Sequence, residues 1–246
     1  MAVVKKVPEK IARQVPFCPG CGHGIVVRLI MECVEELGYN DNVIFGKPVG
    51  CASLLDNSLD IDIFTGAHGR NGASLTAIKR LKPDTLVISY QGDGDAYNIG
   101  FAETMNAAYR NEKFTVVTIN NTNFGMTGGQ MAWTTMPGQK TTTSVNGRDV
   151  ELSGLPIKMP EMIATSFDTA YVARGALFTP AEINKTKGYI KKALQAQIDG
   201  IGHSMVEVLS PCPTNWHMSP LEAQERIIKE LVPYYPLGEL KNKGGK

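Results

Sequence analysis

The sequence predicts an α/β protein with an open, mostly parallel sheet and helices on both of its faces. Two apolar runs, at 85–90 and 114–119, have the composition of strands that are buried on both sides. Between them, residues 95–110 carry apolar side chains at helical spacing. Strand, helix and strand in this order form one βαβ unit, and open sheets of this kind bind ligands at the carboxyl ends of their strands.

Polar side chains follow both strands of this unit. Asp93 comes after the first strand, and Asn121 and Asn123 come after the second. In a right-handed crossover the two strand ends can lie side by side, so the three residues can converge. One carboxylate, one amide oxygen and one backbone carbonyl leave room for phosphate oxygens and a water around an octahedral Mg²⁺.

Glycines lie beside these polar residues in both turns. They are Gly92, Gly94, Gly125, Gly128 and Gly129. Because they have no Cβ atom, backbone N–H groups can approach a diphosphate closely there. A nucleotide-binding turn, or a turn without a ligand, is the alternative interpretation, since a single GxG motif is a weak signal.

Length and composition limit the class of protein. The 246 residues, 43% of them hydrophobic, are enough for a single domain that spans 1–246. The net charge of +1 provides no basic surface, so nucleic acid is not an expected partner. No apolar run reaches the roughly 20 residues that cross a bilayer, and no signal peptide precedes the fold. These features predict a soluble cytoplasmic protein with no membrane partner.

The other elements follow from periodicity and from helix start signals. Further strands are expected at 43–49, 167–175 and 203–209, and further helices at 25–37, 180–198 and 220–231. Thr179 and Pro180 suit the N-cap and first position of a helix. The polar segment 139–160 predicts a long loop over the site or at a subunit interface. The tail at 241–246 is of low complexity.

Four of the five cysteines fall where one edge of the sheet could gather them. Cys18 and Cys21 form a CxxC turn, whereas Cys51 and Cys212 each follow a predicted strand. Cys33 lies inside a predicted helix and is interpreted as a core residue. A disulfide framework is the poorer explanation without a secretory signal. Four thiolates bind zinc or a 4Fe–4S cluster, and the single CxxC pair with a proline after the last cysteine favours the cluster.

The order of these motifs resembles a known family. GDG at 92–94 followed by NN at 120–121 is similar to the thiamin diphosphate signature. CPGCGHG at 18–24, GC at 50–51, HGR at 68–70 and TGGQ at 127–130 accompany it. Over about residues 7–241 the chain resembles the β subunit of 2-oxoacid:ferredoxin oxidoreductases. The resemblance implies the thiamin diphosphate-binding fold, specifically its diphosphate-binding domain.

The resemblance also assigns residues to cofactors. It implies that Asp93, Asn121 and the Asn123 carbonyl bind Mg²⁺. It implies that Cys18, Cys21, Cys51 and Cys212 hold a 4Fe–4S cluster beside the thiamin. The residues predicted to contact thiamin diphosphate are Gly50, Cys51, Ala52, Gly92, Gly94, Asp95, Gly125, Met126 and Thr127.

Three further residues are candidate catalytic groups. His23 follows the CxxC turn and His68 precedes Arg70 in the HGR motif. Either histidine contacts the cofactor or substrate, or it makes structural hydrogen bonds in its loop. Arg70 pairs with a carboxylate or phosphate in bidentate fashion, or it ties two loops together.

The resemblance implies oxidative decarboxylation of a 2-oxoacid to acyl-CoA and CO₂, with electrons passed through the cluster to ferredoxin. In this family the glutamate that activates thiamin belongs to a pyrimidine-binding domain on an α subunit. We therefore expect the chain to be inactive alone and to work with that α subunit, a γ subunit and a ferredoxin-like δ subunit. The C-terminal segment, about 211–246, has an apolar stretch at 234–237 that docks on a partner or packs on its own domain.

The favoured substrate is a branched-chain 2-oxoacid such as 2-ketoisovalerate, with 2-oxoglutarate or pyruvate as the alternative. Gly128 stands where some family members have a lysine that could meet a distal carboxylate, and Trp133 stands where a proline is expected. Two rival functions remain. A non-oxidative thiamin decarboxylase subunit would leave the four cysteines unexplained, and a zinc-stabilised binding module would make the GDGD…NN pattern a coincidence.

Overall fold

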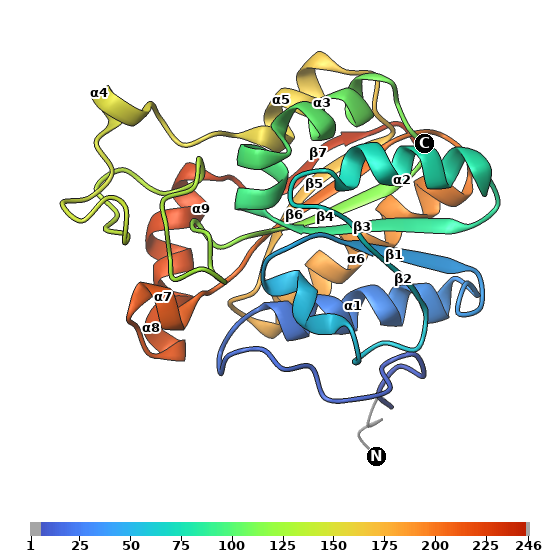
Figure 1. The fold of residues 1–246 in the computed structure, drawn as a ribbon, viewed down its shortest axis with the longest axis horizontal. Helices are drawn as coiled ribbons and strands as arrows, with labels where there is room; N and C mark the ends of the chain where they lie inside the picture. Colours follow the sequence, from blue (N-terminus) through green and yellow to red (C-terminus); the bar gives the residue numbers. More distant parts are fainter. Residues whose placement is uncertain (1–5, 245–246) are drawn as a thin grey trace.

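The computed structural model describes residues 6–244, and within this range the chain forms a seven-stranded sheet. The strand order is β2-β1-β3-β4-β6-β5-β7, and neighbouring strands are parallel except for β5 and β7. The strands are β1 (Val43–Lys47), β2 (Asp62–Thr65), β3 (Leu86–Gly92), β4 (Thr115–Asn120), β5 (Tyr171–Ala176), β6 (Ser204–Leu209) and β7 (Gly238–Asn242). The predicted open, mostly parallel α/β sheet is confirmed (Figure 1).

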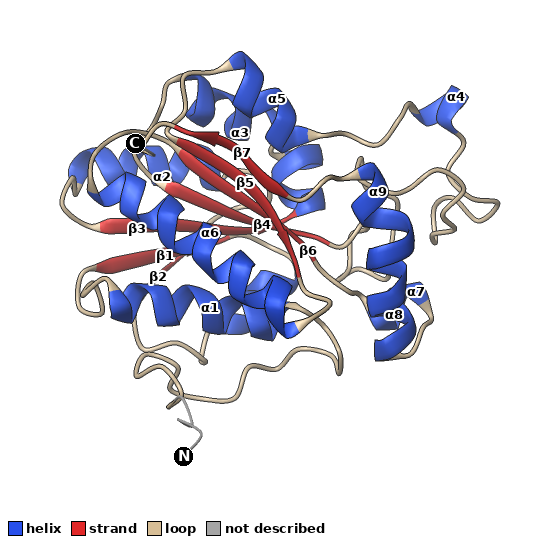
Figure 2. Ribbon diagram, turned by 180° about the vertical axis from the view of Figure 1, so that it is seen from behind, coloured by secondary structure: helices blue, strands red, loops and turns tan. Residues whose placement is uncertain are grey.

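Helices cover both faces of the sheet (Figure 1, Figure 2). One face packs against α1 (His23–Glu36) and α6 (Pro180–Ile198), and the other packs against α2 (Asn71–Leu81), α3 (Phe101–Tyr109) and α5 (Met159–Ser166). As a result, every residue of β1, β4, β5 and β6 is buried. Strands covered on both faces take apolar residues at consecutive positions, which is the pattern that predicted β3 and β4.

The helix predicted at 95–110 is interrupted. Gly94–Ile99 forms a π-helical turn, and α3 begins only after Gly100. A Cβ atom on Gly100 would lie 2.5 Å from the carbonyl oxygen of Gly69, and one on Gly69 would lie 2.7 Å from the amide nitrogen of Gly100. The loop before α2 therefore packs directly against the interruption. This contact brings His68 to the turn that follows β3.

Some elements are additional to those that periodicity predicts. β2 and β7 contain exposed positions and no apolar run, so only their pairing with β1 and β5 identifies them as strands. The N-cap prediction for α6 is confirmed, since the Thr179 side chain accepts a hydrogen bond from the Glu182 N–H. The helix predicted at 220–231 is α8 (Pro220–Arg226), a π-helical turn (Ile227–Leu231) and α9 (Val232–Tyr234). The short helix α7 (Pro213–Trp216) precedes them.

The segment 139–160, predicted as a long loop, is irregular except for the short helix α4 (Val150–Ser153) and its last two residues, which begin α5. Figure 1 shows α4 projecting away from the sheet. The base of the segment is anchored by Arg148, which donates hydrogen bonds to the carbonyl oxygens of Trp133 (3.0 Å) and Thr135 (2.8 Å). The loop that follows the metal-binding motif is therefore fastened to this segment.

The C-terminal segment packs on its own domain at Tyr235, whose side chain is fully buried. β7 then adds to the edge of the sheet beside β5. Residues 245 and 246 of the predicted docking segment lie outside the described residues, as do residues 1–5 of the predicted domain. Within 6–244, no helix has both the length and the apolar character of a membrane span, and the cytoplasmic location stays a prediction.

Candidate thiamin diphosphate site

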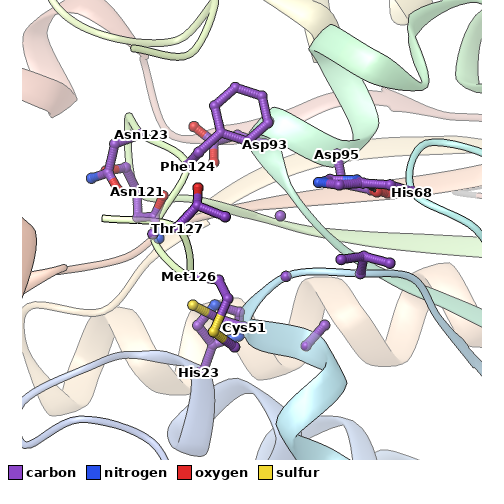
Figure 3. Close-up of a pocket in the computed structure, with 16 residues that line it drawn as sticks. His23, Cys51, His68, Asp93, Asp95, Asn121, Asn123, Phe124, Met126 and Thr127 are labelled. Atoms are coloured by element: carbon purple, nitrogen blue, oxygen red, sulfur yellow. Dashed lines mark hydrogen bonds and ion pairs between the residues drawn. The ribbon is translucent and has the colours of Figure 1, made fainter. Parts of the chain in front are cut away.

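A pocket lies at the carboxyl ends of β1 to β4. β2 lies on one side of β1, and the chain then crosses to β3 on the other side of β1. In an open parallel sheet, a crevice forms where the strand order reverses in this way. Its lining contains every residue predicted to contact the cofactor, together with Val49, His23, His68, Asp93, Asn121, Asn123 and Phe124. Figure 3 shows these side chains, with Asp93, Asn121 and Asn123 near one another and His68 against Asp95.

Oxygen atoms converge at the predicted metal position. One terminal atom of the Asn121 amide lies 2.7 Å from the Asn123 carbonyl oxygen and 3.1 Å from Asp93 Oδ1. If that atom is nitrogen, it donates two hydrogen bonds; if it is oxygen, three oxygens face one another and a cation must lie among them. Neighbouring ligands of an octahedral Mg²⁺ with bonds of about 2.1 Å lie about 3 Å apart. The spacing and the chemistry of these donors fit Mg²⁺.

Asp93 is held in this group by a residue outside the motif. Its second oxygen, Oδ2, accepts a hydrogen bond from the Thr134 hydroxyl. Burial raises the pKa of Asp93 to about 7, although the hydrogen bond from Thr134 acts in the opposite direction. A bound cation favours the ionised form of a neighbouring carboxyl group.

Asp95 and His68 form a pair on another side of the pocket. Asp95 Oδ1 accepts hydrogen bonds from His68 Nδ1 and from the Gly69 N–H (2.7 Å), and its Oδ2 accepts one from Gln91 Nε2. Both oxygens of the Asp95 carboxylate therefore already accept hydrogen bonds from within the chain. The predicted contact of Asp95 with a diphosphate would run through its backbone or through His68, and Gln91 is a supporting residue that sequence reasoning missed.

Close packing explains two of the predicted glycines. A Cβ atom on Gly94 would lie 2.5 Å from the ring of Phe124, and one on Gly125 would lie 3.3 Å from Cys51 Sγ. These contacts leave no room for a side chain at Gly94 and little at Gly125. Phe124 and Val49 are lining residues that the sequence motifs did not indicate.

His23 is a buried, neutral member of the lining. Its Nδ1 lies 2.6 Å from the Tyr90 hydroxyl, and its ring stacks on Phe17 with centroids 4.9 Å apart. Burial lowers the pKa of His23 to about 4. The imidazole is therefore uncharged at neutral pH and keeps a fixed orientation at the pocket wall.

The four predicted cluster cysteines are gathered beside the pocket. The pKa of Cys21 is raised to about 12, mainly by burial and in smaller part by the nearby thiols of Cys212, Cys51 and Cys18. Cys33 is apart from this group and donates a hydrogen bond to the carbonyl oxygen of Lys187 (3.6 Å). In the described part of the chain, no three His, Cys, Asp or Glu side chains have the arrangement that holds a single metal ion.

Arg70 lies outside the pocket. Its guanidinium pairs with Glu103 (2.6 Å) and donates to the carbonyl oxygen of Ile99 (3.3 Å), so it ties the loop before α2 to α3. This is the alternative role that the sequence allowed.

The residues after Cys212 support the site and were not predicted to do so. Asn215 donates hydrogen bonds to the Gly125 carbonyl oxygen (2.9 Å) and to Cys212 Sγ (3.5 Å). Trp216 Nε1 donates to the Asn121 carbonyl oxygen (3.1 Å). Their position directly after a predicted cluster ligand was the only available signal.

The fold and the pocket define the class of protein. Residues 49–208 match the model of the thiamine pyrophosphate enzymes, C-terminal TPP binding domain. The solved structure of 2-oxoglutarate:ferredoxin oxidoreductase from Magnetococcus marinus has the same fold, with a TM-score of 0.73 and 24% identity over 96% of this chain and 84% of that chain. The chain thus belongs to the thiamine pyrophosphate enzymes, and residues 49–208 are their C-terminal, TPP-binding domain.

Sequence relatives narrow the family. KorB, a 2-oxoglutarate synthase subunit of Archaeoglobus fulgidus, is 35% identical over 211 residues, which are 86% of this chain and 74% of KorB. VorA, a ketoisovalerate oxidoreductase subunit of Methanothermobacter thermautotrophicus, is 45% identical over 87% of this chain but only 45% of VorA. The chain therefore spans less than half of that relative. It belongs to the family of 2-oxoacid:ferredoxin oxidoreductase subunits, as a β-type subunit.

Proposed function

We propose that this chain is the cofactor-binding β subunit of an enzyme that oxidatively decarboxylates a 2-oxoacid to acyl-CoA and CO₂ and reduces ferredoxin. The observation that carries the proposal is the position of Cys51, which lines the pocket and also belongs to the four-cysteine group. A cofactor in the pocket and a cluster on the cysteines would share this wall. Such a wall offers electrons a short path from one to the other.

The pocket supports binding of thiamin diphosphate through Mg²⁺. In the proposed site, Asp93 Oδ1, the Asn121 side chain and the Asn123 carbonyl oxygen bind the metal, which neutralises the diphosphate. Backbone N–H groups at Gly92, Gly94 and Gly125 approach the phosphates, while Gly50, Ala52, Met126 and Thr127 line the rest of the site. When bound, thiamin diphosphate supplies the carbanion chemistry that releases CO₂, and the protein supplies position and electrostatics.

The cysteine group supports a 4Fe–4S cluster on Cys18, Cys21, Cys51 and Cys212. Its thiols are close enough to shift one another's pKa, and Cys51 among them also lines the pocket. Zinc is the alternative metal for these cysteines, and iron and zinc analysis of the purified complex distinguishes the two.

His23 and His68 are the proposed contacts to cofactor or substrate. His23 presents a neutral imidazole at the pocket wall, and His68 is oriented by Asp95. Arg70 is left out of the proposed site because it is paired with Glu103 outside the pocket.

In the proposed complex a partner completes the site. Among the described residues that line the pocket, the two carboxylates are Asp93, assigned here to the metal, and Asp95, which is bonded to His68, Gly69 and Gln91, and there is no glutamate. We assign the glutamate that activates thiamin to the pyrimidine-binding domain of an α subunit, and we expect γ and ferredoxin-like δ subunits, ferredoxin and coenzyme A as the other partners.

The substrate proposal is a branched-chain 2-oxoacid, with 2-oxoglutarate or pyruvate as the alternative. The ketoisovalerate-named VorA is 45% identical to this chain and the 2-oxoglutarate-named KorB is 35% identical, which supports this order. Acyl-CoA formation by the purified complex should be faster with 2-ketoisovalerate than with 2-oxoglutarate at equal concentration. A faster reaction with 2-oxoglutarate would instead assign this dicarboxylate as the substrate.

The decisive experiment is an absorption spectrum with iron and zinc analysis of the complex purified without oxygen. About four irons per chain, after subtraction of partner clusters, would support the oxidoreductase. One zinc, or no metal on the cysteines, would instead favour a non-oxidative thiamin decarboxylase subunit.

A further inference from the structure

The loop that follows the metal-binding motif folds back over Asp93. Thr134, in this loop, is fully buried, and its hydroxyl donates a hydrogen bond to Asp93 Oδ2. The other oxygen, Oδ1, is the one that faces the Asn121 amide. Thr134 follows Asp93 by 41 residues and belongs to neither half of the thiamin diphosphate motif.

Thr134 is itself held in place by contacts on both sides. The Tyr235 hydroxyl donates a hydrogen bond to the Thr134 carbonyl oxygen at 3.0 Å. Arg148 donates to the carbonyl oxygens of the flanking residues Trp133 and Thr135. Tyr235 and Arg148 are both buried, so these contacts are shielded from water.

The hydrogen bond from the Thr134 hydroxyl restricts how the Asp93 carboxylate can turn. A carboxylate that is free to rotate about its Cβ–Cγ bond would present either oxygen, or both, to a cation. A donor fixed on Oδ2 stops this rotation and leaves Oδ1 aimed at Asn121 and the Asn123 carbonyl. Partners that orient metal ligands in this way typically change metal affinity roughly 10- to 100-fold when they are removed.

We propose that Thr134 is a positioning residue for the Mg²⁺ that anchors the cofactor, and that Tyr235 from the C-terminal segment holds Thr134 for this task. The inference rests on the proposed Mg²⁺ site at Asp93, Asn121 and Asn123. It adds a supporting shell built from the loop that follows the motif and from the distant C-terminal segment.

The test is a calorimetric titration of Mg²⁺ into the full chain with any partner chains that purify with it, at a fixed concentration of thiamin diphosphate. Thr134→Val should lower the Mg²⁺ affinity roughly 10- to 100-fold. Thr134→Ser, which keeps the hydroxyl, should restore most of it. Tyr235→Phe, which keeps the ring but loses the donor, should lower the affinity by a smaller factor.

Thr169→Val is the matched control. Thr169 is also a fully buried threonine, but its hydroxyl has no hydrogen-bond partner among residues 6–244. This variant should bind Mg²⁺ with the affinity of the natural chain, and the melting temperature of each variant should be recorded beside its affinity.

Three outcomes would overturn the proposal: natural affinity in Thr134→Val, an equal loss in Thr134→Ser and Thr134→Val, or a loss that Thr169→Val shares. Natural affinity in Tyr235→Phe would overturn its second part. Asp93→Ala separates this proposal from the one on which it rests. If that variant keeps its Mg²⁺ affinity, the metal site itself is wrong; if it loses affinity while Thr134→Val does not, only the positioning role is wrong.

Discussion

Asp93 shows how burial and function oppose each other at a single residue. Its side chain is 1% exposed, and burial raises its pKa to about 7, so in this environment ionisation is costly. The proposed function requires the ionised form, because a neutral carboxyl group is a poor ligand for a hard divalent cation. The cation and the carboxylate therefore stabilise each other, and neither is expected to be favourable at this position alone.

Asp93→Ala should reduce Mg²⁺-dependent binding of thiamin diphosphate by more than about 100-fold, since loss of a ligand costs more than loss of a supporting partner. Calorimetry of the full complex measures this. Asp84→Ala, at an exposed position away from the pocket, is the control and should bind normally. Normal affinity in Asp93→Ala would mean that the metal binds elsewhere.

Cys51→Ser should lose iron and the ability to reduce ferredoxin while the fold is kept, because a serine hydroxyl is a much weaker ligand for iron than a thiolate. Iron analysis and circular dichroism measure the two effects. Cys33→Ala is the control. Cys33 lies in the core, away from the four-cysteine group, so the iron content of this variant should be unchanged. If Cys51→Ser reduced ferredoxin at the natural rate, the assignment of Cys51 as a cluster ligand would be wrong.

At the scale of elements, the interruption after β3 decides the shape of the site. The chain turns through a π-helical segment, Gly94–Ile99, instead of entering α3 directly. π-helical turns within helices often mark functional sites. Gly69 and Gly100 meet backbone to backbone at this point, and the contact places His68 within hydrogen-bonding distance of Asp95. Apolar periodicity is nearly the same in an α-helix and a π-turn of this length, so the sequence pattern did not show the interruption.

Gly100→Ala should destabilise the protein by about 1–3 kcal/mol, because its Cβ would overlap the carbonyl oxygens of Gly69 and Asp95. Gly188→Ala is the contrasting variant. Gly188 lies in α6 with open space around it, so alanine there should stabilise the protein by about 0.5–1 kcal/mol. Urea unfolding measures both, and a shift of the same sign in the two variants would contradict this account.

At the scale of the whole molecule, buried charges join the sheet to the C-terminal segment. Arg174 is fully buried and pairs with Glu207 on β6 and Glu161 on α5, and it also donates to the Pro236 carbonyl oxygen (3.1 Å). Tyr97, in the π-helical segment, donates to the other oxygen of Glu207 (2.9 Å). This network fixes the path of the C-terminal segment, which in turn supplies Tyr235 to the loop over Asp93.

His203 gives the global stability a defined dependence on pH. Burial lowers its pKa from 6.5 to about 4, so between these values the unfolded chain binds a proton that the folded chain does not. Stability from this residue is therefore present above pH 6.5 and is lost as pH falls toward 4, by about 3 kcal/mol in total. Urea unfolding of His203→Gln should show a shallower loss than the natural chain from pH 7 to 4.5. Equal slopes would contradict the assignment.

Much of the fold and the site follows from sequence because it depends on short-range patterns. Strands covered on both faces leave apolar runs, and a helix start leaves Thr179 and Pro180 in adjacent positions. The ligands Asp93, Asn121 and Asn123 come directly after such strands, so parallel pairing of β3 with β4 is enough to bring them together. The same argument placed Cys51 and Cys212 at strand ends.

What the sequence by itself determined is therefore the parallel sheet, the family and the residues that converge at the strand ends, because these depend on alternation, spacing and local turn chemistry. Only the tertiary structure decided which side chains support them. Thr134 on Asp93, Tyr235 on Thr134, His68 on Asp95, and the placement of Arg70 outside the pocket all depend on segments that meet in space. Contacts between such segments are set by the packing of the whole chain, which leaves no periodic signal in the sequence around either partner.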